Sequence, residues 1–124
     1  MARILIVDDE DYVRSLLKDM LEGKGYALDL ACDGASAFGL LRDNPFDLAI
    51  IDLTMPVMNG VQLVRLIRNN PKMRATKIML CTGAEVPEDV NKAAAAGVDD
   101  YIIKPFDSKT LLDKVAKLVS PSTR

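Results

Sequence analysis

The chain contains no histidine, and only two of its 124 residues are cysteines. Without histidine, the chain itself cannot form a histidine-dependent catalytic triad or use a histidine as general base. Cys32 and Cys81 form no CxxC motif, and two isolated cysteines do not supply the ligand set of a zinc site. Because each cysteine lies in an apolar run, we expect both to be buried, reduced thiols.

Long apolar runs and glycine-rich phosphate loops are also absent. No run approaches the ~20 residues of a transmembrane helix, and the run Ile4–Val7 is too short for the core of a signal peptide. We therefore expect a cytoplasmic protein without membrane attachment. Neither GxxxxGK(S/T) nor GxGxxG occurs, which argues against a nucleotide-binding domain. The 16 basic and 18 acidic residues give a net charge of −2, which offers no basis for direct binding to nucleic acid.

The residues that are present predict one α/β domain. Five short apolar runs have the character of strands: Ile4–Val7, Ala27–Cys32, Leu48–Ile51, Ile78–Cys81 and Tyr101–Ile103. Segments with apolar residues at helical spacing follow each run, which predicts a parallel (βα)5 sheet covered on both faces, a three-layer arrangement. The second run alternates around Asp29, as an edge strand would. We expect the domain to span residues 1–119, with 120–124 as a flexible tail or the start of a linker.

Turn and capping residues place the helix ends. Gly23 and Gly25 predict the end of the first helix, Gly97 predicts the end of the fourth, and Asp107 or Ser108 would cap the fifth. On the third helix, Arg65 and Arg68 are expected to be solvated charges.

Three acids fall where predicted strands end. Asp8 and Asp9 follow the first run, and Asp52 follows the third. Ligands bind at the carboxyl edge of parallel sheets, so neighbouring strands would bring these carboxylates together, although Asp9 could instead only cap the next helix. Two such charges ~4 Å apart repel by roughly 4 kcal/mol at an effective dielectric near 20. A cation would relieve this repulsion, and a few oxygen ligands suit Mg²⁺, for which Mn²⁺ could substitute.

Further polar residues end the fourth and fifth runs at the same edge. Lys104 would add a positive charge, and Thr82 would offer a hydroxyl to an anion, with Gly83 and Ala84 leaving backbone N–H groups unobstructed. A carboxylate beside Mg²⁺ can attack phosphorus to give an acyl phosphate, with Lys104 offsetting the remaining negative charge. Asp52 is the candidate nucleophile.

This ordered set resembles the receiver domain of two-component response regulators. Asp8 and Asp9 match the acidic pair of that family, and Asp52 matches its phosphoacceptor. Thr82 and Tyr101 match its two switch residues. The matching structural positions are Pro56 and Gly60 after the acceptor, and Lys104-Pro105-Phe106, in which Pro105 takes the position of the cis-proline. The resemblance covers the chain from Arg3 to about Val119 and implies a flavodoxin-like sheet of strand order 2-1-3-4-5.

The resemblance also implies a mechanism and partners. A sensor histidine kinase or histidine phosphotransfer protein would donate the phosphoryl group, and Asp9, Asp52 and the backbone carbonyl of Thr54 would hold Mg²⁺, with Asp8 acting mainly through water. Lys104 would contact the phosphoryl group, Thr82 would move to bond it, and Tyr101 would rotate inward. The face formed by the fourth helix, fifth strand and fifth helix would then change shape and signal to an output partner that the sequence does not identify.

The resemblance describes a switch that catalyses only its own phosphorylation and dephosphorylation, as a monomer or an activation-dependent dimer. Two alternatives remain open at this point. One is a pseudo-receiver that binds proteins without being phosphorylated. The other is a phosphatase of the haloacid dehalogenase type, although that family needs an acid two residues after the nucleophile, where this chain has Thr54. Thr54 and Ala84 also occupy positions that tune the lifetime of the phosphoryl group in receivers.

Overall fold

Five parallel strands and five helices alternate along the chain, as predicted. The structure is a computed structural model that describes residues 1–83 and 87–120. The strands are β1 (Arg3–Val7), β2 (Ala27–Ala31), β3 (Leu48–Asp52), β4 (Lys77–Thr82) and β5 (Asp100–Ile103). The helices are α1 (Asp11–Leu21), α2 (Gly34–Asp43), α3 (Gly60–Arg68), α4 (Pro87–Ala96) and α5 (Ser108–Val119). The strand order is β2-β1-β3-β4-β5, which confirms the expected fold class.

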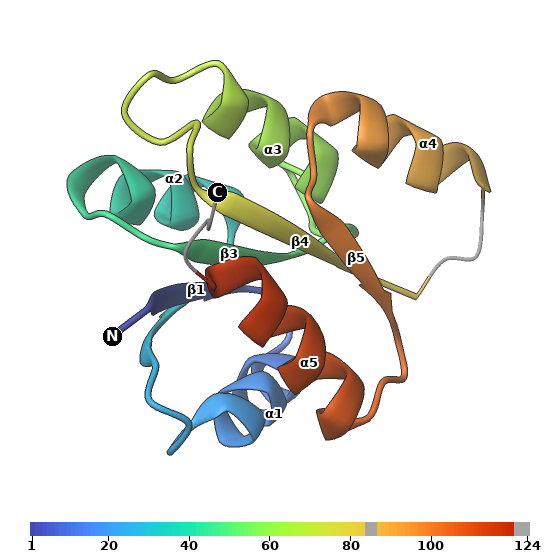
Figure 1. The fold of residues 1–124 in the computed structure, drawn as a ribbon. Helices are drawn as coiled ribbons and strands as arrows, with labels where there is room; N and C mark the ends of the chain where they lie inside the picture. The colour runs from blue at the N-terminus through green and yellow to red at the C-terminus, as the bar shows by residue number, and fades with distance from the viewer. Residues whose placement is uncertain (84–86, 121–124) are drawn as a thin grey trace.

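The sheet separates two layers of helices. In Figure 1, α1 and α5 cover one face, and α2, α3 and α4 cover the other. Alternate residues of each central strand enter different cores, because successive side chains of a strand point to opposite faces. In β3, for example, Ile50 packs in the core beneath α1 and α5, while Ile51 packs in the core beneath α2 and α3.

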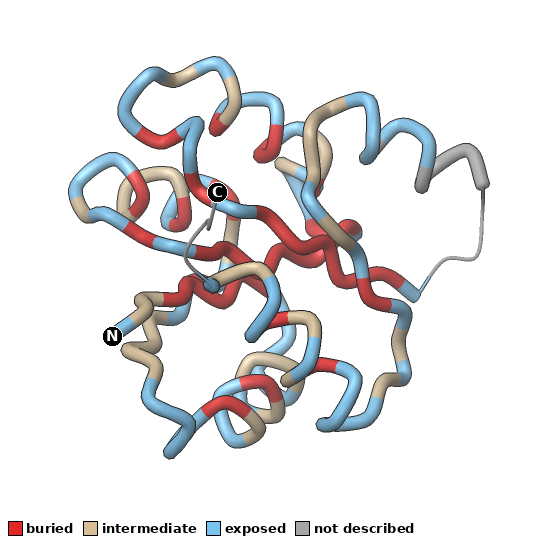
Figure 2. Tube along the Cα trace, viewed as in Figure 1, coloured by how far each residue is buried: buried red, intermediate tan, exposed pale blue. Residues whose placement is uncertain are grey.

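Burial along the strands follows their place in the sheet. All five residues of β3 are buried, and the central strands form the continuous buried centre of the molecule in Figure 2. β2 lies at the edge, as its alternating sequence predicts, and Asp29 there pairs with Arg3 at 2.8 Å. The sheet therefore presents the buried carboxyl ends of β1 and β3 side by side, near its middle.

Side-chain caps begin three of the helices. Asp33 caps α2, Asp107 caps α5, and Asn59 forms a reciprocal capping box with Gln62 at the start of α3. The alternative in which Asp9 caps the first helix is wrong, because the residue at that position is Glu10 and its side chain makes no capping hydrogen bond. Asp9 is one residue too early to cap α1.

Two other expectations are corrected. Cys81 is buried, but Cys32 is exposed because β2 ends at Ala31 and Cys32 falls in the turn before α2. Arg68 is not a solvated charge: its side chain is 22 % exposed and bonded to neighbouring backbone.

The glycines predicted to end helices have the backbone conformation that this role needs. Gly23, Gly25 and Gly97 all have positive φ.

Some expectations cannot be compared with the fold. Ala84 and the end of the expected tail, residues 121–124, lie outside the described residues. Across the described ranges, no helix is both long enough and apolar enough to cross a membrane.

Candidate functional site

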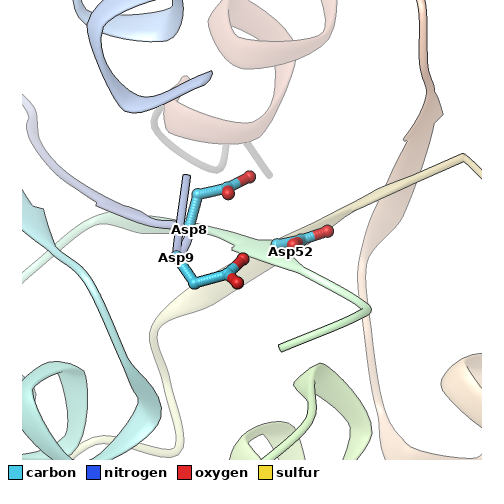
Figure 3. Close-up of side chains that lie close together, drawn as sticks. All are labelled: Asp8, Asp9 and Asp52. Carbon is cyan, nitrogen blue, oxygen red and sulfur yellow. The ribbon is translucent and has the colours of Figure 1, made fainter. Parts of the chain in front are cut away.

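The three acids predicted from the strand ends lie together in the structure. β1 and β3 are neighbours, and Val7 pairs with Ile51, so Asp8 and Asp52 occupy the next position of the same register. Asp8, Asp9 and Asp52 each offer a carboxylate oxygen, and these oxygens lie within 4.8 Å of one another. Figure 3 shows the three carboxylates gathered where the two strands end.

The cluster runs from the interior to the surface. Asp8 and Asp52 are 1 % and 4 % exposed, while Asp9 is exposed. Oδ1 of Asp8 accepts a hydrogen bond from the backbone N–H of Glu10 at 2.9 Å. Oδ1 of Asp52 accepts a longer one from the backbone N–H of Thr54 at 3.4 Å. The buried pair is therefore partly bonded to its own loops, and Asp9 borders solvent.

Lys104 supplies the positive charge that the sequence predicts at this edge. Its Nζ lies 3.3 Å from Oδ1 of Asp52 and 3.5 Å from Oδ2 of Asp8. Asp8, Asp52 and Lys104 all continue the alternate strand residues that face α1 and α5, so the period of two explains why they meet. Burial opposes the charge of Lys104, but the attraction of Asp52 and Asp8 outweighs it and raises the pKa of the ammonium.

The Asp52 carboxyl ionises with difficulty. Burial, together with the charge of Asp8, raises its pKa to about 6, against the lowering effects of Lys104 and the Thr54 N–H. Three carboxylates against one ammonium leave two negative charges uncompensated when all are ionised. A small divalent cation would remove this imbalance, and a donor set made only of carboxylate oxygens fits Mg²⁺ better than zinc.

The two candidate switch residues are placed differently. Thr82 ends β4 and is 3 % exposed, beside β3, where Asp52 pairs with Cys81. Tyr101 is on the edge strand β5 and is 42 % exposed, with Lys114 Nζ 6.0 Å from the centre of its ring. The structure therefore places Thr82 inside, near the carboxyl end of β3, and leaves Tyr101 at the surface.

The connection between β3 and α3 is closely fitted to the site. The Gly60 N–H donates to the carbonyl of Leu53 at 2.9 Å. A Cβ on Gly60 would lie 2.6 Å from the carbonyl oxygen of Asp52 and 2.8 Å from the Cα of Leu53, closer than real contacts allow. Only glycine lets α3 begin this close to Asp52. Pro56 and Thr54 lie in the same connection and are exposed.

The Lys104-Pro105 peptide bond is cis, as the family resemblance implies for that position. Lys104 is also attached to the neighbouring strand, because its backbone N–H donates to the carbonyl of Thr82 at 2.7 Å. The end of β5 is thereby fixed beside the end of β4.

Arg14 is a residue of the site that the sequence analysis missed. Its guanidinium on α1 donates through Nη1 to the backbone carbonyl of Asp8 at 2.6 Å, and it also pairs with Asp11. The bond holds the end of β1, from which both Asp8 and Asp9 project. Only the helical spacing from Asp11 could have hinted at a partnership, because a backbone acceptor leaves no mark in the sequence.

Comparison with known proteins agrees with this geometry. The response regulator receiver domain family matches residues 4–116. The chain is 32 % identical to the chemotaxis protein CheY of Pseudomonas aeruginosa over 117 residues, which cover 94 % of each chain. The structure of Vibrio cholerae CheY4 superposes with a TM-score of 0.90 at 32 % identity, covering 95 % of this chain and 98 % of that one.

A third similar protein was solved with a bound metal ion. The receiver domain of a sensor histidine kinase from Pseudomonas aeruginosa was solved with a magnesium ion coordinated in its active site cleft. It superposes with a TM-score of 0.88 at 27 % identity, covering 95 % of this chain and 97 % of that one.

Proposed function

Because this chain belongs to the response regulator receiver domain family, we propose that it accepts a phosphoryl group on Asp52 and uses it as a conformational switch. Receiver domains are signalling modules rather than metabolic enzymes. The observation that carries the proposal is the buried Asp52 carboxylate, close to two further carboxylates and 3.3 Å from the Lys104 ammonium.

The donor in this proposal is a phosphohistidine on a sensor histidine kinase or a histidine phosphotransfer protein, in the cytoplasm. A carboxylate oxygen of Asp52 attacks phosphorus, the P–N bond to the donor imidazole breaks, and the imidazole leaves with the bonding electron pair and takes a proton. Lys104 is near enough to Asp52 to neutralise part of the charge that arrives with the phosphoryl group. In the proposed switch, Thr82 then bonds the phosphoryl oxygen, and Tyr101 moves inward.

Mg²⁺ is the expected cofactor. Asp8, Asp9, Asp52 and the backbone carbonyl of Thr54 would hold it, and when bound it would offset the negative charge of both the carboxylates and the incoming phosphoryl group. In the metal-free chain, burial and then the charge of Asp8 raise the pKa of Asp52 to about 6. Asp8, which adds to this cost, is also one of the residues that would bind the cation.

Phosphorylation can be tested with acetyl phosphate as a small donor. We expect acetyl phosphate and Mg²⁺ to add one group of about 80 Da, stable in acid and labile in base, as intact mass spectrometry would show. Asp52→Asn should abolish the addition. Asp19→Asn, which removes an exposed carboxylate on α1, should not.

Three other results would overturn the proposal. No added mass in the wild-type chain would favour the pseudo-receiver, and an unchanged addition in Asp52→Asn would place the acceptor elsewhere. Continuous hydrolysis of small phosphate monoesters would instead indicate a phosphatase, for which Thr54 takes the place of the required second acid.

A further inference from the structure

Arg68, at the end of α3, makes hydrogen bonds to three backbone carbonyls and one carboxylate. Its Nε donates to the carbonyl of Gly97 at 2.8 Å. Nη1 donates to the carbonyls of Arg74 and Thr76 at 2.7 and 2.6 Å. Nη2 pairs with Oδ2 of Asp99 at 2.9 Å. A partly buried guanidinium with four acceptors is firmly held in one orientation.

These acceptors belong to two separate connections of the fold. Arg74 and Thr76 precede β4, Gly97 directly follows α4, and Asp99 directly precedes β5. Asp99 adds a second joint, since its Oδ2 accepts the backbone N–H of Ile78 at 2.8 Å. Its own N–H donates to the carbonyl of Ile78 at 2.9 Å. One guanidinium thus ties α3 to the start of β4 and to the connection between α4 and β5.

The fit is specific to arginine and to a glycine facing it. Lysine has a single nitrogen and could not satisfy acceptors spread around a planar fork. Gly97 has φ of +105°, and a Cβ there would lie 3.2 Å from the Cγ of Arg68. The turn after α4 is therefore shaped to receive this side chain.

The carboxyl end of α4 is held by packing and by the turn that follows it. Ala96 and Val98 pack against the core beneath α2 and α3, next to the bonds from Arg68. Asn91 and Lys92 are exposed. The joint also lies at the amino end of β5, five residues before Lys104, which is roughly 16 Å along a strand.

We propose that Arg68 is a positioning residue that fixes the carboxyl end of α4 and the amino end of β5, so that phosphorylation of Asp52 moves the α4–β5–α5 face about this fixed end. The inference rests on the proposed function, because it requires a change that starts at Asp52. A change starting there reaches β5 at Lys104, which contacts Asp52. The bonds of Arg68 resist it at the opposite end of the strand.

Amide hydrogen exchange of the full chain, measured by NMR with and without Mg²⁺ and beryllofluoride, tests the proposal. In the wild type, we expect beryllofluoride to change exchange at Gly83 and Lys104 and to leave Ile78 and Asp99 within about twofold. In Arg68→Gln, the Ile78 amide should exchange about tenfold faster at rest, because Asp99, which accepts the hydrogen bond of this amide, loses its charge-assisted bond from Arg68. In this variant the Ile78 amide should also respond to beryllofluoride. Arg65→Gln, on the exposed face of the same helix, should behave as the wild type.

The contrary outcomes are distinct. If Arg68→Gln gives the wild-type response at Ile78 and Asp99, or if these amides respond in the wild type as strongly as Lys104 does, Arg68 is not the fixed point. If Arg68→Gln does not fold, Arg68→Lys retains the charge but loses the fork, and the same comparison applies. If beryllofluoride alters no amide in the wild type, or alters the same amides in Asp52→Asn as in the wild type, the proposed function is overturned and this inference with it.

Discussion

Asp52 is a carboxyl group placed where its charge is unfavourable. It is 4 % exposed and faces the charge of Asp8, and the Lys104 ammonium only partly compensates, so its pKa rises from 3.8 to about 6. A carboxyl that binds its proton more tightly in the folded chain contributes most to stability below pH ~4. That contribution is lost as the pH rises through about 6.

We therefore expect Asp52→Asn to stabilise the metal-free protein at neutral pH. The neutral amide removes the buried charge, and the shift sets an upper limit of about 3 kcal/mol on the gain in free energy of unfolding at pH 7.5. Below pH ~4 the gain should disappear, because the wild-type carboxyl is then protonated in both states. Urea unfolding in EDTA, at pH 7.5 and again below pH ~4, measures this difference, with Asp19→Asn as a control. Equal stability of Asp52→Asn and wild type at pH 7.5 would contradict the account.

Gly60 is expected to tolerate no side chain. In Gly60→Ala, the Cβ would meet the backbone of Asp52 and Leu53, which cannot move aside as a flexible side chain could. We expect a loss of about 1–3 kcal/mol in the free energy of unfolding. Gly39→Ala is a matched control inside α2, where the nearest atom to the new Cβ is Arg42 Nη2 at 3.9 Å. That substitution should be neutral or stabilising by up to ~1 kcal/mol. Thermal or urea unfolding would show whether the two glycines differ.

Residues differ in how well their position and partners can be predicted from the sequence. Asp52 and Lys104 could be predicted to meet because each stands at the end of an apolar run, and strand ends gather at one edge. Arg14 and Arg68 could not, since their main acceptors are backbone carbonyls, whose positions depend on the assembled fold. Cys32 was misplaced because one residue decides whether a side chain belongs to the strand or to the turn that follows it.

At the scale of elements, the connection from β3 to α3 is held at both ends and has a strained backbone in its middle. The Gly60 N–H bonded to the Leu53 carbonyl holds the near end, and the capping box of Asn59 and Gln62 holds the far end. Between them, Val57 has φ of +68° and is fully exposed, at the centre of a tight turn closed by the Met58 N–H bonded to the carbonyl of Pro56 at 2.7 Å. A β-branched residue is costly at positive φ, and no burial of Val57 offsets that cost.

Val57→Asn should consequently stabilise the protein. Asparagine adopts positive φ more readily, and the replaced valine buries nothing, so we expect a gain of about 0.5–1 kcal/mol in the free energy of unfolding. Val57→Ala serves as a comparison, because it removes the branching but keeps the cost of positive φ for a residue with a Cβ. Urea unfolding should rank the asparagine variant as the most stable of the three. A valine chain as stable as the asparagine variant would show that position 57 carries no strain.

The elements themselves were largely predictable. Each predicted strand agrees with the structure to within one residue at either end, because apolar runs bounded by charges are a strong local signal. The strand order could not be predicted from the apolar pattern, because that pattern is compatible with several strand orders. The order came from the family resemblance. The sequence left open whether Asp9 caps the first helix, because Asp9 and Glu10 are both acidic and only the backbone places Glu10 at that position.

For the molecule as a whole, Mg²⁺ should act as a stabilising ligand. A cation that binds only the folded chain adds about 2.7 kcal/mol at a concentration of roughly one hundred times its Kd. We expect thermal unfolding at pH 7.5 to shift upward with Mg²⁺ and to return to its starting value with EDTA. Asp52→Asn, which lacks one of the three carboxylates, should show a smaller shift. Identical shifts in both chains would exclude Asp52 as a ligand.

The sheet also divides the interior of the domain into two separate cores. Ile50 and Ile51 are adjacent in sequence, yet they belong to separate cores on opposite faces of β3. Substitutions in the two compartments share few contacts, so their energetic effects should add, whereas two substitutions within one compartment should not. Over evolutionary time, one half of the interior could then drift in sequence while the other stays unchanged.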